Sequence, residues 1–230
     1  MLINGIDIST YGAKLLDRNI STNRMSSNYS WEFNFDSPSF FGSSLDFKDV
    51  LLYVLFKAEN EETFLKRLGK LSEQLRYGAT VKFKDISVEY KMYLKEKPEY
   101  DRLTDKYYKV TFSLDGDFGL SNTKVFQGTE ITSLNVKNNG TYTTPIRLEI
   151  TFPNTHNNVT ISGLEHTIYL KNIGANSTIV LDSITGDILY NGEAGIDKFD
   201  GFYLPKVKTG EATIRSSVNC NMTVSFKERY

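Results

Sequence analysis

Residues 218–227 read VNCNMTVSFK, and their alternation decides the class of fold. Every second residue is apolar, and polar side chains stand between. This is the period of a β-strand that turns one face to a core and the other to water. The apolar positions are Val218, Cys220, Met222, Val224 and Phe226. The pattern predicts a half-buried antiparallel strand near the end of the chain.

Similar short segments precede this strand, separated by residues that favour turns. They are IRLEITF at 146–152, VTISG at 159–163, TIYLKN at 167–172, TIVLDS at 178–183 and DILYNG at 187–192. Short strands at intervals of about ten residues, with turn signals between them, are typical of an antiparallel sandwich. No helical pattern interrupts the series, so the second half is predicted to be all β.

The first half carries one clear helical signal. Asn60 can cap a helix, and Gly78 stands just beyond its expected end. One face holds Phe64, Leu68, Leu71 and Leu75 at helical spacing. Strands are expected at 2–8 (with a turn at Asn4-Gly5), 45–57, 79–83, 86–95 and 107–114. The first half is therefore predicted to be an α+β domain with one helix packed on a sheet.

Residues 115–129 lose this periodicity and contain Gly116, Gly119, Ser121 and Asn122. We place a domain boundary there, giving domains 1–122 and 123–230. The fold class is predicted to be mainly β.

Composition excludes several classes of function. The chain has 27 basic and 28 acidic residues, so it lacks the basic excess usual for nucleic-acid or membrane-surface binding. No stretch approaches the roughly 18 consecutive apolar residues of a membrane span, so no membrane insertion is expected. The single cysteine excludes an intramolecular disulfide and a cysteine-based metal cluster.

The candidate chemical residues are few and poorly placed for catalysis. His156 lies in a polar turn sequence and His166 opens a strand. Cys220 belongs to the apolar face of the last strand, where a thiol is inert. Asp115 and Asp117 flank a glycine, and a tight turn explains them better than a calcium loop with missing ligands. We expect no catalytic residues, no metal site and no cofactor.

Ordered motifs give a resemblance. Asn139-Gly140-Thr141 with Pro145 opens the second half, and LDSITGDILYNG follows at 181–192. GFYLPKVKTGEATIRSS and a closing NMTVSFKERY complete the series, while INGIDISTYG opens the chain at 3–12. This order resembles the distal tail protein (Dit) family of siphophages, in its plain form without an inserted carbohydrate-binding domain. Ala212 departs from the pattern, because the family often has asparagine after Gly210.

The resemblance implies a split-barrel-like sheet in the first domain and a galectin-like β-sandwich in the second. It implies a homo-hexameric ring made by the first domain, with the sandwich projecting outward. The ring would join the tail tube protein to the tail-associated hub or lysin protein and, in many phages, to receptor-binding proteins. DNA would pass through its lumen without specific binding. The location implied is the tail tip of the virion, after synthesis in the bacterial host cytoplasm.

A closed ring needs two unlike surfaces on each subunit. Residues 21–44 are the candidate for one, because long functional loops and aromatic anchors often have this composition. The proposed interface residues are Trp31, Phe33, Phe35, Phe40 and Phe41.

Two alternatives stand beside the adaptor. The first is a carbohydrate-binding module in host-surface recognition, for which exposed strand aromatics would serve. The sequence contains 14 Tyr, 15 Phe and one Trp, but it does not separate exposed rings from buried ones. The second is an enzyme such as a peptidoglycan hydrolase, against which the shortage of histidine, cysteine and paired acids counts.

Overall fold

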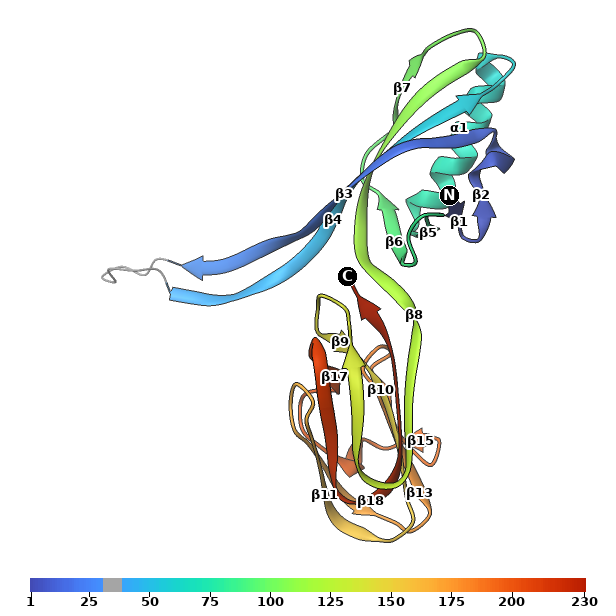
Figure 1. The fold of residues 1–230 in the computed structure, drawn as a ribbon. Coiled ribbons are helices and arrows are strands. Elements are labelled where there is room, and N and C mark those ends of the chain that lie inside the picture. The colour runs from blue at the N-terminus through green and yellow to red at the C-terminus, as the bar shows by residue number, and fades with distance from the viewer. Residues whose placement is uncertain (31–38) are drawn as a thin grey trace. The chain divides into compact units, whose positions relative to one another are not determined.

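The computed structural model describes the backbone of residues 1–30 and 39–230 and the side chains of residues 1–23 and 47–230. The chain divides into two compact units, Met1–Gly119 and Leu120–Tyr230 (Figure 1). Both units are built mainly of antiparallel strands, so the predicted fold class is confirmed. No helix within the described ranges has the length and hydrophobicity needed to cross a membrane.

The elements of the first unit are β1 (Leu2–Ile3), β2 (Ile6–Asp7), the 3-10 helix η1 (Ile8–Tyr11), β3 (Ala13–Ser30), β4 (Ser39–Lys57), α1 (Glu61–Arg76), β5 (Ala79–Lys82), β6 (Glu89–Leu94) and β7 (Glu99–Arg102). Strand β8 (Tyr107–Asn138) begins in this unit and ends in the next. The second unit continues with β9 (Thr144–Pro145), β10 (Arg147–Phe152), β11 (His156–Ser162), β12 (Ile168–Ile173), β13 (Ser177–Asp182), β14 (Ile188–Tyr190), β15 (Glu193–Ala194), η2 (Ile196–Lys198), β16 (Phe199–Asp200), β17 (Lys206–Val207) and β18 (Gly210–Arg229).

Helix α1 confirms the helical prediction. Asn60 caps it, because the Asn60 side-chain oxygen accepts a hydrogen bond of 2.8 Å from the Thr63 amide. The four apolar residues predicted to share one face are the buried residues of the helix. One of them, Phe64, stacks on Tyr108 with ring centroids 4.0 Å apart and an interplanar angle of 5°. This contact joins the helix to the sheet strand β8.

The sheet of the first unit runs β8-β6-β5-β1-β2, and β8 also pairs with β4 and β7. The predicted strand at 2–8 is two short strands, which turn at Asn4 (φ 50°) and Gly5 (φ 80°). Two successive positive φ angles make the type I′ turn that joins tightly paired strands, so the turn prediction is confirmed. Strand β4 supplies the centre of the core with Val50, Leu52, Val54 and Phe56.

The second unit is a sandwich, as predicted. One layer pairs β14, β13, β10 and the end of β18, and the other pairs β16, β12, β11 and the beginning of β18. Strand β18 serves both layers, and its pairing with β8 shifts register between Arg215 and Cys220. The apolar face predicted for residues 218–227 faces the core at four of its five positions: Cys220, Met222, Val224 and Phe226. Val218 is only partly buried against that core.

Strand β8 differs from the sequence prediction. Residues 115–129 are continuous strand, although they lack an alternating pattern. The predicted tight turn at Asp115-Gly116-Asp117 is wrong, because Asp115 and Gly116 pair with Asp49 and Lys48 of β4. A pairing partner on a neighbouring strand thus sets the backbone conformation here.

Candidate interaction surfaces

The aromatic stretch proposed as an interface is largely part of a hairpin. Residues 21–30 lie in β3 and residues 39–44 in β4, so the expectation of a long loop is wrong for these two segments. The backbones of Tyr29 and Phe40 pair across it, and Phe41 follows in β4. The side chains of Phe40 and Phe41 lie outside the described residues. Trp31, Phe33 and Phe35 lie outside them entirely.

The outer part of this hairpin, residues 24–30 and 39–46, is here named the hairpin arm. Pairing of β4 with β8 extends only as far as Lys48 and Gly116, whereas pairing of β4 with β3 continues to Ser39 and Ser30. Among the described strands, those of the hairpin arm therefore pair only with each other. Within the described backbone, the outer edges of both strands of the arm therefore have no pairing partner, which is the condition that favours addition of another strand.

A bidentate ion pair stabilises the base of the hairpin. Arg18 of β3 donates to both carboxylate oxygens of Asp85, at 2.8 and 2.6 Å, and its guanidinium lies 4.2 Å from the centroid of the Phe83 ring. The hydrogen bonds from Arg18 lower the pKa of the Asp85 carboxyl. On the neighbouring strand, the Asp49 amide donates to Ser21 Oγ at 2.8 Å. These contacts fix the inner residues from which the arm extends.

The first unit has a second and different surface at the turn between β7 and β8. Leu103 and Tyr107 close this turn through a backbone hydrogen bond of 2.9 Å. Arg102 donates to Asp105 at 2.7 Å across it. The exposed fractions are 41% for Tyr100, 55% for Leu103 and 37% for Tyr107. We name Tyr100, Leu103 and Tyr107 the β7–β8 patch, an apolar surface unlike the open backbone of the arm.

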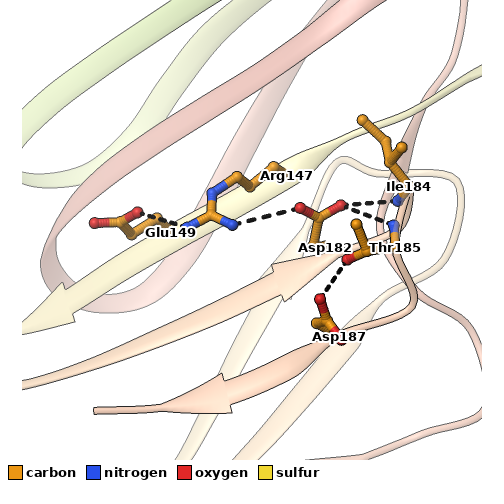
Figure 2. A network of polar contacts seen from close by, with 6 residues as sticks. All are labelled: Arg147, Glu149, Asp182, Ile184, Thr185 and Asp187. Atoms are coloured by element: carbon orange, nitrogen blue, oxygen red, sulfur yellow. Dashed lines mark hydrogen bonds and ion pairs between the residues drawn. The ribbon is translucent and has the colours of Figure 1, made fainter. Parts of the chain in front are cut away.

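The motif at 181–192 takes part in a network of hydrogen bonds and ion pairs in the second unit (Figure 2). Asp182 is 7% exposed, and its side chain accepts from the amides of Ile184 (2.8 Å) and Thr185 (3.3 Å). Arg147 pairs with the same carboxylate at 3.4 Å. Gly186 takes a φ of 87°, which a turn of this shape needs. Asp182 thus stabilises the turn between β13 and β14 and is not free to act on a substrate.

The opening motif at Asn139 is tied to the closing strand. Glu228 is 3% exposed, and its carboxylate accepts from the backbone and side-chain amides of Asn139, both at 3.0 Å, and from the Tyr230 hydroxyl at 2.9 Å. Burial would raise the pKa of Glu228, but these hydrogen bonds outweigh it and leave the pKa lowered. At Gly140, an added Cβ would come within 2.9 Å of the Arg229 amide nitrogen. Motif residues far apart in sequence therefore close the sandwich together.

The candidate chemical residues lie apart from one another. His156 begins strand β11, so its predicted place in a turn is wrong. Cys220 is fully buried, as predicted, and burial raises the pKa of its thiol. His166 is exposed and stacks on Tyr203. Within residues 1–23 and 47–230, no three His, Cys, Asp or Glu side chains gather as they would around a metal ion.

The comparisons with known proteins agree with this architecture. Residues 139–230 match the family model described as siphovirus-type tail component, C-terminal domain. The structure of the SPP1 Dit protein (gp 19.1), presented as a paradigm of the hub adsorption apparatus in phages that infect Gram-positive bacteria, has a TM-score of 0.76. It is 14% identical, and the match covers 100% of this chain and 98% of that one.

Two structures of the phage P2 baseplate in its activated conformation, with Ca and with Sr, match with TM-scores of 0.49 and 0.48. Each is 9% identical, with 97% of this chain and 93% of the other covered. No curated protein matches the chain in sequence.

The matched family and the shared fold define the chain as a structural component of a phage tail or baseplate. Within this class, residues 139–230 match the siphovirus-type tail component family, and the whole chain shares the fold of SPP1 Dit.

Proposed function

We propose that the chain is the ring-forming adaptor of a phage tail tip. Six copies form a closed ring, which joins the tail tube to the hub protein and the receptor-binding apparatus. DNA crosses the lumen without specific binding, which fits a net charge of −1. The carrying observation is the fold shared with SPP1 Dit along the whole chain.

The first unit offers the two unlike surfaces that a closed ring needs. A rotational ring is made by heterologous contacts, in which one patch meets a different patch on the next subunit. The hairpin arm has two open strand edges, and an isolated two-stranded ribbon is only marginally stable in water. We infer that the arm docks on the β7–β8 patch of the neighbour. Phe40 and Phe41 of the arm, with Trp31, Phe33 and Phe35 of the segment that joins its two strands in sequence, are the proposed aromatic anchors.

The test begins with an arm-shortened variant. Met25 and Leu45 are paired, so replacing residues 26–44 by Asn-Gly should close the hairpin with a two-residue turn. A second variant, Leu103→Asp, places a charge in the β7–β8 patch. Ile184→Asp is the control, because Ile184 is 64% exposed and lies in the second unit. Light scattering should give six times the 26.2-kDa chain mass for wild type and control, and one chain mass for each variant.

Mixing the two variants separates ring contacts from other modes of assembly. The Leu103→Asp chain keeps its arm, and the shortened chain keeps its β7–β8 patch. A heterologous contact should therefore form between them once, giving a dimer but never a ring. Ring formation by either folded variant would refute this interface. If wild-type protein stays monomeric, wild type and the mixtures are examined again with purified hub protein added. If wild type forms no ring under these conditions either, the adaptor proposal is refuted.

A further inference from the structure

A group of exposed aromatic side chains lies at the edge of the second unit. Tyr169 of β12 pairs with Asp200 of β16, so both side chains project from the outer face of that layer. The chain then turns through Phe202 and Tyr203. The exposed fractions are 52% for Tyr169, 98% for Phe202 and 61% for Tyr203. We name Tyr169, Phe202, Tyr203 and His166 the aromatic platform.

The aromatic platform surrounds an open depression of about 460 Å³. His166 and Tyr203 stack on one side of it, with ring centroids 4.3 Å apart and an angle of 24° between the planes. The depression is also lined by Thr167 and Asp200. Its volume falls in the range of small-ligand sites, roughly 300–1,000 Å³.

The polar groups of this depression are available to a ligand. The Asp200 carboxylate makes no ion pair and accepts no hydrogen bond from any of the described residues. It lies one strand spacing from the Tyr169 side chain. The exposed Tyr and Phe rings contribute apolar area that water solvates poorly, and the carboxylate beside them accepts hydrogen bonds. Together they form an amphipathic site.

We propose that the aromatic platform binds a saccharide chain built of pyranose rings. A pyranose presents C–H groups on its faces and hydroxyl groups around its edge. The C–H face packs on Tyr203 or Phe202, and the Asp200 carboxylate accepts hydrogen bonds from the hydroxyls. Tyr169 also lines the depression and provides contact for a second sugar unit. Among the described residues that line the depression, Asp200 is the one acidic residue and none is Lys or Arg, which favours a neutral ligand over a strongly anionic one.

The proposal does not depend on ring formation, because all platform residues lie in the second unit. The experiment uses the full chain on an array of bacterial cell-wall oligosaccharides, followed by calorimetric titration of the strongest binder. Tyr203→Ser and Phe202→Ser should each weaken binding at least ten-fold, and Asp200→Asn several-fold. Ile184→Ser is the matched control, since it removes an exposed apolar side chain outside the platform and should leave affinity unchanged.

Saturation-transfer spectroscopy adds a readout that a general folding defect would not imitate. The C–H protons on the sugar face that packs on the aromatic rings should receive more saturation than the C–H protons on the opposite face. Circular dichroism checks that each variant is folded. Absence of binding to every oligosaccharide would overturn the proposal, as would binding that Tyr203→Ser and Phe202→Ser leave unchanged. A third outcome is that wild type binds no sugar but binds a purified receptor-binding protein, and that these variants lose this binding. The sugar proposal would then be overturned, and the platform would be a protein-docking surface.

Discussion

Two glycines of the second unit allow a sharp test of its packing. Gly163 lies between β11 and β12 with φ 85°, and Gly186 lies in the β13–β14 turn with φ 87°. An added Cβ at Gly186 would meet nothing within 4 Å. At Gly163 it would collide with the Thr213 carbonyl oxygen and lie 2.8 Å from the carbonyl carbon. Gly163→Ala and Gly186→Ala therefore share the backbone penalty, and only the first adds a collision.

The magnitudes follow from these two terms. A non-glycine residue in the left-handed region costs about 1–2 kcal/mol. Replacing glycine also lowers the conformational entropy of the unfolded chain, which offsets about 0.4–1 kcal/mol of this cost. Gly186→Ala should therefore lower the free energy of unfolding by about 1 kcal/mol. At Gly163, Thr213 is held in β18 by pairing with Asn135, so it cannot move freely. Overpacking of this kind adds about 1–3 kcal/mol.

Cys220 makes the measurement specific to the second unit. It is the only cysteine and is fully buried in the sandwich core. Pulsed thiol labelling along a urea gradient will therefore follow unfolding of that unit, and circular dichroism will follow the whole chain. The midpoint should fall in the order wild type, Gly186→Ala, Gly163→Ala at unchanged m-value. If the two variants agree within about 0.5 kcal/mol, the close approach of Gly163 to Thr213 is refuted.

Three further outcomes are expected. Asn60→Ala removes the cap of α1 and should destabilise the first unit by about 1 kcal/mol, whereas Asn60→Asp should not; thermal unfolding measures both. Phe64→Ala removes the ring that stacks on Tyr108 and should cost about 3–5 kcal/mol in urea unfolding, and a loss below about 1 kcal/mol would contradict the packing. Glu228→Gln weakens three hydrogen bonds to a carboxylate and should cost about 1–3 kcal/mol at pH 7. The pKa of Glu228 is lowered in the folded state, so its contribution to stability is complete above the unfolded pKa of about 4.3. This contribution is lost as pH falls through the folded pKa. The difference in the free energy of unfolding between wild type and Glu228→Gln should therefore disappear at low pH.

Helix α1 could be predicted in full because every signal for it is local. The cap, the apolar spacing and the glycine beyond the end all lie within one short segment. The last strand β18 was recognisable for the same reason, since its alternation reports a single buried face. The turn at Asn4-Gly5 followed from residues that accept positive φ.

Strand β8 could not be predicted in its central part. Its residues alternate between buried and half-buried from Tyr108 to Leu114, and alternate again from Leu134 to Asn138. Between these segments the residues are exposed or half-buried, except Gly116 and Gly119, so no hydrophobic period marks the strand. Its conformation there follows from pairing with β18, whose residues lie about a hundred positions later in the chain. Such non-local pairing leaves no signal in the local sequence.

The aromatic platform shows the same limit for a candidate site. The sequence identified exposed strand aromatics as the feature that would favour sugar binding, but burial decides which of the many rings qualify. Tyr169 and Asp200 come together because β16, a strand of two residues, pairs with β12. A segment of that length carries no measurable period. The sequence pattern places His166 at the beginning of a strand, and its stack on Tyr203 connects it with the platform.

The three surfaces differ in the kind of contact that each can make. The hairpin arm presents open backbone edges, which pair with a strand or lie against a complementary surface whatever its side chains. The β7–β8 patch presents apolar side chains, which suit a dry protein contact. The aromatic platform combines rings with a free carboxylate, which suits a hydroxylated ligand. Since the first two lie in one unit and the platform in the other, a substitution that abolishes assembly should leave sugar binding by the folded chain intact, and the reverse should also hold.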